Sequence, residues 1–279
     1  LYVGGGGSGN YTKIQDAIDN ASDGDIVYVY DDSSPYYENI RINKLIYLIG
    51  ENKDTTIIDG MGKYLDIITI QNDSVHISNF TIQNTGSKIE SINDGILLYY
   101  CNYISIMNIN FIGCGLSYDF FFPYGSFKNN IKDNYVNNKP LVYFEDKTDE
   151  TIDYPCGQVI LVHCRNITVS DQNISNLRCG IILHHSNNCY LYKNQIYHSG
   201  FGILLCYSNN NTLSDNILSF NFYGFKYGSS NDNIFKKNIL ESNEIGIDDN
   251  LSPFLPLGSN DINITNNIFI KNGEGVNDL

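Results

Sequence analysis

The sequence predicts an all-β fold, a right-handed parallel β-helix (solenoid) with a short N-terminal capping α-helix. The first observation is a repeat of 22 residues within 179–244, which places Gly180, Gly202 and Gly224 in register with one another and with Gly246. A fixed period of this size is typical of solenoids. The second observation is that apolar residues alternate after each glycine and are followed by a turn rich in Ser and Asn. Such alternation indicates strands rather than helices.

The third observation is that stacking these repeats puts like residues in columns. Equivalent residues in neighbouring parallel strands lie about 4.8 Å apart. Side-chain amides can therefore pass hydrogen bonds along a column of asparagines: Asn194, Asn216 and Asn238. A second column alternates in the sign of its charges: Asp171, Lys193, Asp215 and Lys237. Opposite charges on paired strands are mildly stabilising, so both columns support this register.

The first 25 residues are predicted to cap the N-terminal end of the solenoid. After a glycine-rich entry, residues 12–15 fit a capping box. The box opens a short amphipathic helix with an apolar stripe formed by Ile14, Ala17, Ile18 and Ala21. An open solenoid end exposes core and an unpaired strand edge, which this helix would cover. Irregular coils are expected to follow over residues 26–114.

A single β-helix domain is expected to span residues 1–279, with two interruptions of the period. Residues 115–156 are predicted to form an inserted excursion that is rich in aromatic and acidic residues. Regular 22-residue coils follow over 157–279, with a second insertion near 251–257. Insertions in a solenoid emerge on one face and often build its binding surface.

The charge of the chain argues against several classes of partner. A formal net charge of −14 disfavours nucleic acid and anionic membrane surfaces, both of which attract clusters of Lys and Arg. No apolar run approaches the roughly 20 residues that span a bilayer, so no membrane-spanning segment is expected. The chain begins at Leu1 without an initiator Met, and we expect a processed product. Sequons such as Asn10, Asn79 and Asn166 would accept glycans in a secreted or cell-surface protein, which is the expected localisation.

The cysteines and histidines do not predict a metal site. The chain has seven cysteines, an odd number, and none is spaced as C-x-x-C. Cys156 and Cys179 each precede a coil-opening glycine, so they are expected in adjacent coils. There they either form a disulfide or fill the core as small buried residues. The five histidines are scattered and there are only two methionines, so neither a metal nor another cofactor is expected.

Two parts of the chain resemble known proteins. The opening GSGNYTKIQDAIDNASDGDIVYVY, followed by YYENIRI and LIYLIGENKDTTIIDG, resembles the entry segment of the pectin-lyase-like superfamily, where pectin methylesterases begin similarly. The later NNKPLVYF, GQVILVHCRNITV and SNNNT segments are similar to archaeal and bacterial surface β-helix proteins of the carbohydrate-binding and sugar-hydrolase repeat type. Those include the periplasmic maturation protein for nitrous oxide reductase. The resemblance implies the β-helix fold but not one function, because the superfamily hosts lyases, hydrolases, esterases, epimerases and non-catalytic adhesive proteins.

One group of candidate site residues comes from the outward columns of the regular coils. The alternation points one aliphatic column outward, and the excursion at 115–156 is expected to cover it: Ile160, Ile182 and Leu204. Lys226 and Asp248 would then lie one coil apart at its margin, with His184 two coils from Lys226. A lysine or histidine base beside a carboxylate suits a lyase or epimerase that acts on acidic sugars. The alternative is a salt bridge on a solvated ladder.

A second group of candidates surrounds the start of the excursion. The segment Asp119–Phe122 resembles the one that carries the nucleophile of pectin methylesterases, but Pro123 replaces its glycine and no Gly-Arg-Pro follows. These departures argue against esterase activity. Aromatic side chains stack on sugar rings, so a rim of tyrosines suits a glycan. Carbohydrate binding is therefore predicted for Tyr99, Tyr118, Asp119, His184, Lys226 and Asp248, and no catalytic residue is assigned.

These observations predict an exported or cell-surface β-helix protein that binds carbohydrate or forms part of a surface assembly, without catalysis. The expected partner is a polysaccharide or another glycan, or other surface-layer proteins. The alternative is a polysaccharide-acting enzyme, which would be a lyase, an epimerase, a hydrolase or a pectin-methylesterase-like carbohydrate esterase.

Overall fold

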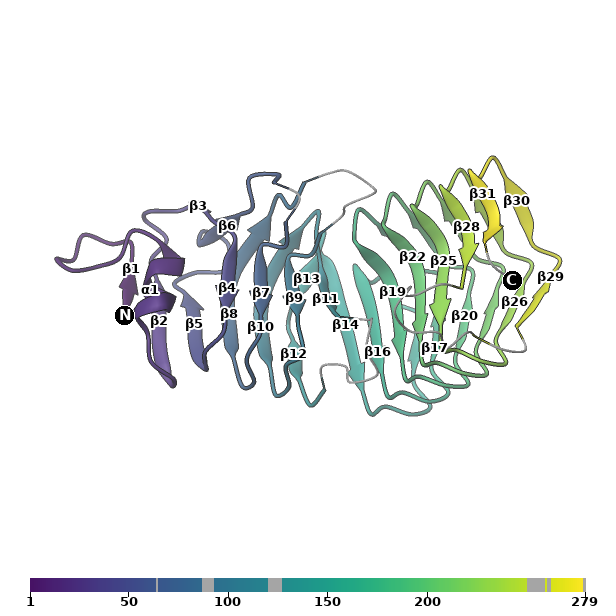
Figure 1. The fold of residues 1–279 in the computed structure, drawn as a ribbon, viewed down its shortest axis with the longest axis horizontal. Coiled ribbons are helices and arrows are strands. Elements are labelled where there is room, and N and C mark those ends of the chain that lie inside the picture. The colour runs from purple at the N-terminus through teal and green to yellow at the C-terminus, as the bar shows by residue number, and fades with distance from the viewer. Residues whose placement is uncertain (64, 87–92, 120–126, 250–258, 260–261, 278–279) are drawn as a thin grey trace. The chain divides into compact units, whose positions relative to one another are not determined.

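The computed structural model describes residues 1–63, 65–86, 93–119, 127–249, 259 and 262–277 (Figure 1). These residues fall into two compact units, of which the first ends at Leu141 and the second begins at Val142. In each unit, parallel strands recur along the chain as the coils of a β-helix. The predicted fold class, an all-β right-handed parallel β-helix with a short N-terminal helix, is confirmed. The described residues contain no helix that is long and apolar enough to cross a membrane.

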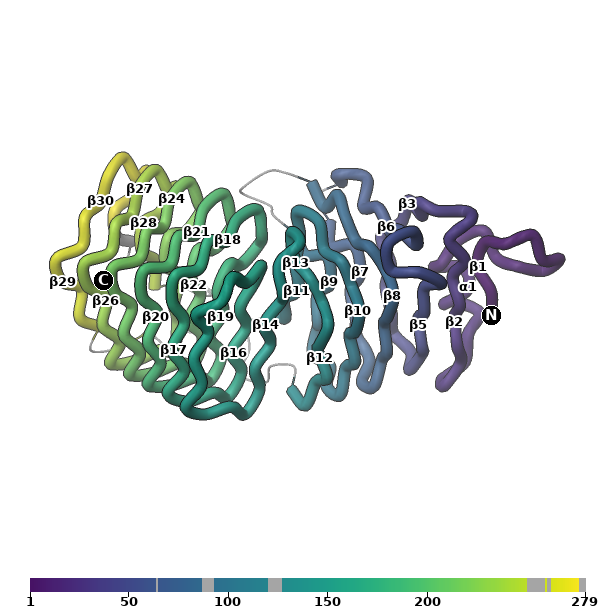
Figure 2. Tube along the Cα trace, turned by 180° about the vertical axis from the view of Figure 1, so that it is seen from behind, coloured from purple at the N-terminus to yellow at the C-terminus, as the bar shows by residue number. Residues whose placement is uncertain are grey.

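The first unit stacks most of its strands in two parallel sheets (Figures 1 and 2). The larger sheet has the order β1 (Tyr2–Val3), β2 (Asp25–Val29), β5 (Ile46–Gly50), β8 (His76–Gln83) and β10 (Ser105–Ile112). At its sides lie β3 (Tyr36–Tyr37), β6 (Ile57–Asp59), β12 (Asn130–Lys132) and β13 (Tyr135–Val136). The smaller sheet contains β4 (Ile40–Ile42), β7 (Ile68–Ile70), β9 (Ile96–Leu98) and β11 (Leu116–Tyr118). Alternate side chains such as Leu48 and Ile77 fill the core between the sheets, because successive residues of a strand point to opposite faces.

The helix α1 (Ile14–Asn20) packs against β1, β2 and β4 and buries its apolar side chains Ile14, Ala17 and Ile18. It thus lies where the predicted cap belongs. The predicted capping box is wrong in detail, because the first residue before the helix makes no side-chain cap. Instead, the Glu38 carboxylate accepts hydrogen bonds from the N–H groups of Ile14 and Gln15 at 2.8 and 3.0 Å. A carboxylate from the next coil therefore satisfies the first turn of the helix.

The second unit is regular and consists of three parallel sheets. The sheet that carries the coil-opening glycines contains β16 (Gln158–Val162), β19 (Cys179–His184), β22 (Phe201–Cys206), β25 (Tyr223–Gly228), β28 (Ile245–Asp248) and β31 (Glu274–Asn277). The next contains β15 (Thr151–Ile152), β17 (Thr168–Ser170), β20 (Tyr190–Tyr192), β23 (Thr212–Ser214), β26 (Ile234–Lys236) and β29 (Asn263–Thr265). The third contains β18 (Asn173–Ser175), β21 (Gln195–Tyr197), β24 (Ile217–Ser219), β27 (Ile239–Glu241) and β30 (Ile268–Ile270). The pairing of Ile182 with Leu204 and of Leu204 with Lys226 gives the predicted register of 22 residues.

The excursion predicted for residues 115–156 is largely built into the coils. Strand β11 pairs with β9, β12 and β13 pair with β10, and β15 pairs with β17. Strand β14 (Lys139–Glu145) begins as the antiparallel partner of β13. The strands can form because their inward positions are apolar and buried: Ile131, Val136, Leu141 and Ile152. The loss of period therefore reflects coils of unequal length. The remainder of this prediction, at 120–126, and the insertion near 251–257 lie outside the described residues.

The two cysteines considered for a disulfide are not joined. Cys156 and Cys179 are both buried thiols, like the other five cysteines of the chain. The structure thus agrees with the alternative in which they fill the core as small apolar residues.

Candidate functional site

The residues predicted to form one site are divided between the two units. Tyr99, Tyr118 and Asp119 belong to the first unit, and His184, Lys226 and Asp248 belong to the second. Each group therefore belongs to a different compact unit.

In the second unit, Lys226 on β25 and Asp248 on β28 are direct neighbours in the sheet, as the repeat predicts. The Lys226 ammonium forms an ion pair with the Asp248 carboxylate, and it lies 4.4 Å from the centre of the Tyr223 ring. The expectation that this pair lies at an exposed margin is wrong. Lys226 is 6% and Asp248 is 3% exposed, because both faces of this sheet are covered. Because both side chains are buried and engaged with each other, this pair presents no solvent-accessible base to a substrate.

The aliphatic column predicted to need a cover is buried throughout: Ile160, Ile182 and Leu204 are each 0% exposed. Of the two segments expected to cover it, Leu141–Phe144 belongs to strand β14 and so forms part of a sheet. The other segment, Phe120–Phe127, lies outside the described residues except for Phe127. The column is thus buried, as predicted, and Leu141–Phe144 is part of a strand rather than of an excursion from the coils.

His184 is also buried, with no exposed surface. Its pKa is lowered to about 3, chiefly by burial and then by the neighbouring His185 and His163. The ring of His184 meets that of His185 edge to face, with centres 4.6 Å apart. Its neighbour in the next coil is Cys206, whose thiol pKa is raised, chiefly by burial. His184 is therefore a neutral side chain near neutral pH and is closed to solvent.

In the first unit, the three predicted residues differ in accessibility. Tyr99 is 39% exposed and meets Tyr100 edge to face, with ring centres 4.6 Å apart. Asp119 is half-buried, and Tyr118 is only 2% exposed. Burial and then the Asp119 carboxylate raise the pKa of Tyr100 to about 12. Tyr99 thus offers a ring face to solvent, whereas Tyr118 belongs to the packed interior.

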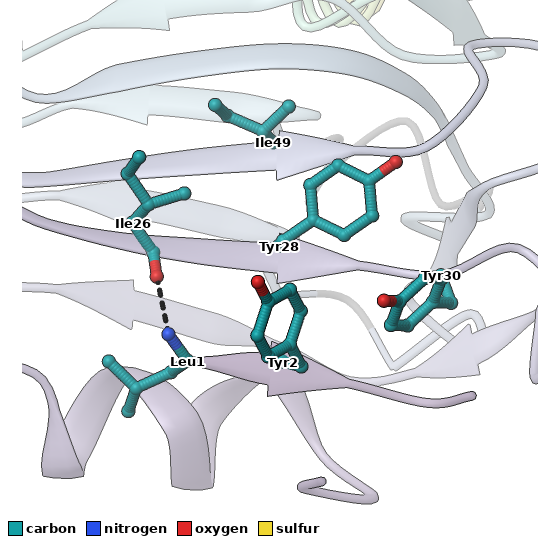
Figure 3. Close-up of a pocket in the computed structure, with 6 residues that line it drawn as sticks. All are labelled: Leu1, Tyr2, Ile26, Tyr28, Tyr30 and Ile49. Carbon is teal, nitrogen blue, oxygen red and sulfur yellow. Dashed lines mark hydrogen bonds between the residues drawn. The ribbon is translucent and has the colours of Figure 1, made fainter. Parts of the chain in front are cut away.

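A cleft on the outer face of the first coils was not predicted as a site. It has a volume of about 480 Å³ and is lined by residues of β1, β2 and β5 and by their neighbours: Leu1, Tyr2, Ile26, Tyr28, Tyr30 and Ile49 (Figure 3). We call it the tyrosine cleft. The rings of Tyr2 and Tyr30 are nearly parallel, with centres 5.9 Å apart and planes inclined by 24°. The ring of Tyr28 stands edge-on to that of Tyr30, with centres 5.2 Å apart.

The tyrosine cleft follows from the alternation of one strand. In β2, the side chains of Val27 and Val29 point inward and are fully buried, so Ile26, Tyr28 and the following Tyr30 point outward. Register then brings Tyr2 of β1 beside Tyr28. The outward run of one isoleucine and two tyrosines is the signal that could have identified this surface from the sequence.

The coils define a parallel β-helix protein, and the tyrosine cleft is an aromatic surface on its first coils. Residues 148–278, just under half of the chain, match the family described as "Periplasmic copper-binding protein (NosD)". The match confirms, for the later part of the chain, the resemblance to periplasmic β-helix proteins that the sequence predicts. None of the curated proteins matches the sequence.

Among solved structures, the A-module of mannuronan C-5 epimerase AlgE4 from Azotobacter vinelandii aligns at 12% identity and a TM-score of 0.34, covering 95% of this chain and 92% of that chain. Endopolygalacturonase I from Stereum purpureum aligns at 12% identity and a TM-score of 0.34, covering 91% and 88%. A pectin methylesterase in complex with a hexasaccharide aligns at 12% identity and a TM-score of 0.36, covering 86% and 78%. TM-scores this low support no inference about this chain.

The described residues do not form a site for the copper that the family description implies. Among the described residues, no group of three or more His, Cys, Asp or Glu side chains is arranged to hold a metal ion. The densest group of histidines contains His163, His184 and His185, with ring centres 5.2 Å apart between His163 and His185. Its central member, His184, is closed to solvent, whereas an exchangeable copper site needs accessible nitrogen or sulfur ligands.

Proposed function

We propose that this protein is an exported or cell-surface β-helix protein that binds carbohydrate without converting it, and that the tyrosine cleft is the binding site. The observation that supports this proposal is the cleft itself. It joins three tyrosines on an open face, and Tyr2 is 54% exposed. Aromatic faces pack against the C–H faces of sugar rings, while tyrosine hydroxyls hydrogen-bond to sugar hydroxyls. Its volume lies within the range of known ligand sites, roughly 300 to 1,000 Å³.

The absence of catalysis is inferred from the lining of the tyrosine cleft. Its six lining residues include no carboxylate, histidine or cysteine. Hydrolysis and epimerisation of sugars require a positioned acid and base, which are most often carboxylates or histidine. The export is supported by the family match, since that family is described as periplasmic.

The experiment combines retention and turnover. The protein is passed over immobilised neutral and uronic-acid polysaccharides, and soluble products are assayed in parallel. We expect retention on at least one polysaccharide and no product. Tyr28→Ala should weaken binding at least about tenfold, because it removes a ring contact and its apolar area.

Tyr190→Ala is the matched control, since Tyr190 is 51% exposed on β20 of the second unit. If Tyr28→Ala is retained as strongly as the original protein, the tyrosine cleft is not the binding site. Formation of soluble products from a polysaccharide would contradict binding without catalysis and would favour the alternative, a polysaccharide-acting enzyme.

A further inference from the structure

The tyrosine cleft continues across the sheet as a row of outward-pointing side chains. Ile26 of β2 pairs with Tyr47 of β5, and Tyr47 pairs with His76 of β8. The rings of Tyr47 and His76 are stacked, with centres 4.4 Å apart and planes inclined by 9°. Ile26 is 52% and Tyr47 is 37% exposed. We call the surface formed by Tyr2, Ile26, Tyr28, Tyr47 and His76 the aromatic track.

The spacing of the aromatic track suits a chain of sugars. Neighbouring strands of a sheet lie about 4.8 Å apart, which is close to the length of one pyranose residue in an extended polysaccharide. Each of β1, β2, β5 and β8 contributes at least one ring or branched aliphatic side chain to the track. A linear glycan that lies across these strands would therefore place one sugar ring on each coil.

The charge around the aromatic track disfavours acidic sugars. None of the residues that line the tyrosine cleft is a lysine or arginine. Two carboxylates, those of Asp31 and Glu51, act electrostatically on Tyr28 of the cleft. The Glu51 carboxylate accepts a hydrogen bond from the Asp31 N–H at 3.0 Å, and the Asp31 carboxylate accepts one from Thr55 Oγ1 at 2.5 Å. Both carboxylates raise the pKa of Tyr28, after the larger effect of burial.

Two cations of these coils are engaged elsewhere. The Lys44 ammonium donates to the backbone carbonyls of Ile18, Asp19 and Ala21 at the end of α1. The Arg41 guanidinium donates to Gln71 at 2.6 Å. A polyuronate would thus meet negative charge from Asp31 and Glu51 and no Lys or Arg side chain among the lining residues of the cleft, so its carboxylates would lose hydration without an ion pair to a side chain.

From this geometry we infer that the aromatic track binds a linear, uncharged polysaccharide of β-1,4-linked pyranoses, with one sugar ring on each of four successive coils. The inference rests on the proposed function and adds the class of glycan and its direction along the stack. Equatorial linkages keep successive rings in a flat ribbon, which can lie over the two adjoining rows of the track, Tyr2 with Tyr28 and Ile26 with Tyr47 and His76.

The test is a titration with neutral β-1,4-linked gluco-oligosaccharides, from the monosaccharide to the hexasaccharide, followed by calorimetry. Affinity should rise at least about tenfold between disaccharide and tetrasaccharide and then level off, because the aromatic track spans four strands. Tyr47→Ala should reduce the affinity for the tetrasaccharide to that for the disaccharide. Tyr37→Ala is the matched control, since Tyr37 is 60% exposed on β3 and belongs to neither the tyrosine cleft nor the aromatic track.

A second titration uses galacturonate oligosaccharides of equal length at low salt. We expect at least about tenfold weaker binding than for the neutral hexasaccharide, and Glu51→Gln should narrow this difference. The amide oxygen of the substituted side chain would still accept the hydrogen bond from the Asp31 N–H, so the fold of this turn is retained.

The outcomes separate the two proposals. Equal affinity for all lengths would overturn the aromatic track and leave binding in the tyrosine cleft intact. Tighter binding of galacturonate would overturn the choice of an uncharged glycan. Failure of every oligosaccharide and polysaccharide to bind would overturn the proposed function together with this inference.

Discussion

Asn216 accepts two hydrogen bonds from Asn194 of the preceding coil, one from the backbone N–H and one from the side-chain Nδ2, both at 3.0 Å. Its own Nδ2 donates to the carbonyl of Leu191 and to the side chain of Asn238, both at 2.9 Å. Asn216 is fully buried. One side chain thus links three coils and satisfies a backbone group that would otherwise be buried without a partner.

We predict that Asn216→Asp destabilises the second unit by about 1 to 3 kcal/mol at neutral pH. The carboxylate keeps both accepted bonds but loses both donated ones, and it places a charge in the core. Burial raises the pKa of such a carboxyl, so protonation at lower pH removes the charge and the loss should shrink as pH falls. Urea unfolding over a pH series measures the loss of stability and its dependence on pH. Asn173→Asp on the exposed surface of β18 is the control, and equal effects at both positions would contradict the ladder.

The column of coil-opening glycines gives a second prediction. A Cβ on Gly224 would lie 2.5 Å from the carbonyl oxygen of Gly246 and 2.9 Å from Leu240 Cδ2. The backbone of the next coil cannot give way without distorting the sheet, so Gly224→Ala should cost about 1 to 3 kcal/mol of stability. Thermal unfolding measures the loss. Gly6→Ala is the control, because a Cβ there meets nothing within 4 Å. An unchanged melting temperature for Gly224→Ala would contradict this close approach.

The regular coils could be predicted because a fixed period determines which residues stack. The positions of Asn216 and Gly224 in their columns follow from the repeat of 22 residues alone. The burial of Lys226 and Asp248 could not be predicted in this way. Alternation assigns a side chain to one face of a sheet, but it does not say whether other atoms cover that face.

The tyrosine cleft and the aromatic track were missed for a different reason. Tyr28 pairs with Ile49 and Tyr47 pairs with His76, so successive offsets are 21 and 29 residues. Without a constant offset, the sequence does not reveal which outward rings become neighbours. The alternation within β2 was visible, but the register between the first coils had to come from the structure.

The buried ion pair gives a third prediction. Lys226→Met should cost about 3 to 5 kcal/mol, because it leaves the Asp248 carboxylate buried without its partner ammonium. The double substitution Lys226→Met with Asp248→Leu should recover much of this loss, since it leaves no buried charge that requires a partner. Denaturant unfolding of the single and double variants measures the coupling between them. Independent, additive losses would contradict a buried pair and would indicate two solvated charges.

The last prediction concerns acid stability and His184. The pKa of this imidazole is about 3 in the folded protein, because burial opposes the charge, against an ordinary value of 6.5. The unfolded chain therefore binds a proton at this position below pH 6.5, whereas the folded protein binds it only below about pH 3. Stability from this residue is fully present above pH 6.5 and is lost as pH falls towards 3, by at most about 1.4 kcal/mol per pH unit.

His184→Leu removes the titrating group and keeps an apolar side chain beside Cys206 and Val162. The free energy of unfolding of this variant should therefore fall less steeply than that of the original protein between pH 6.5 and 3. His198→Gln is the matched control, because His198 lies on the exposed surface of the same unit. Carboxylates contribute equally to the pH dependence of stability in all three proteins. The difference between the pH profiles of the original protein and His184→Leu therefore isolates the contribution of His184. Parallel profiles for the original protein and His184→Leu would show that solvent reaches this imidazole, and would reopen the outer face of β19 as a binding surface.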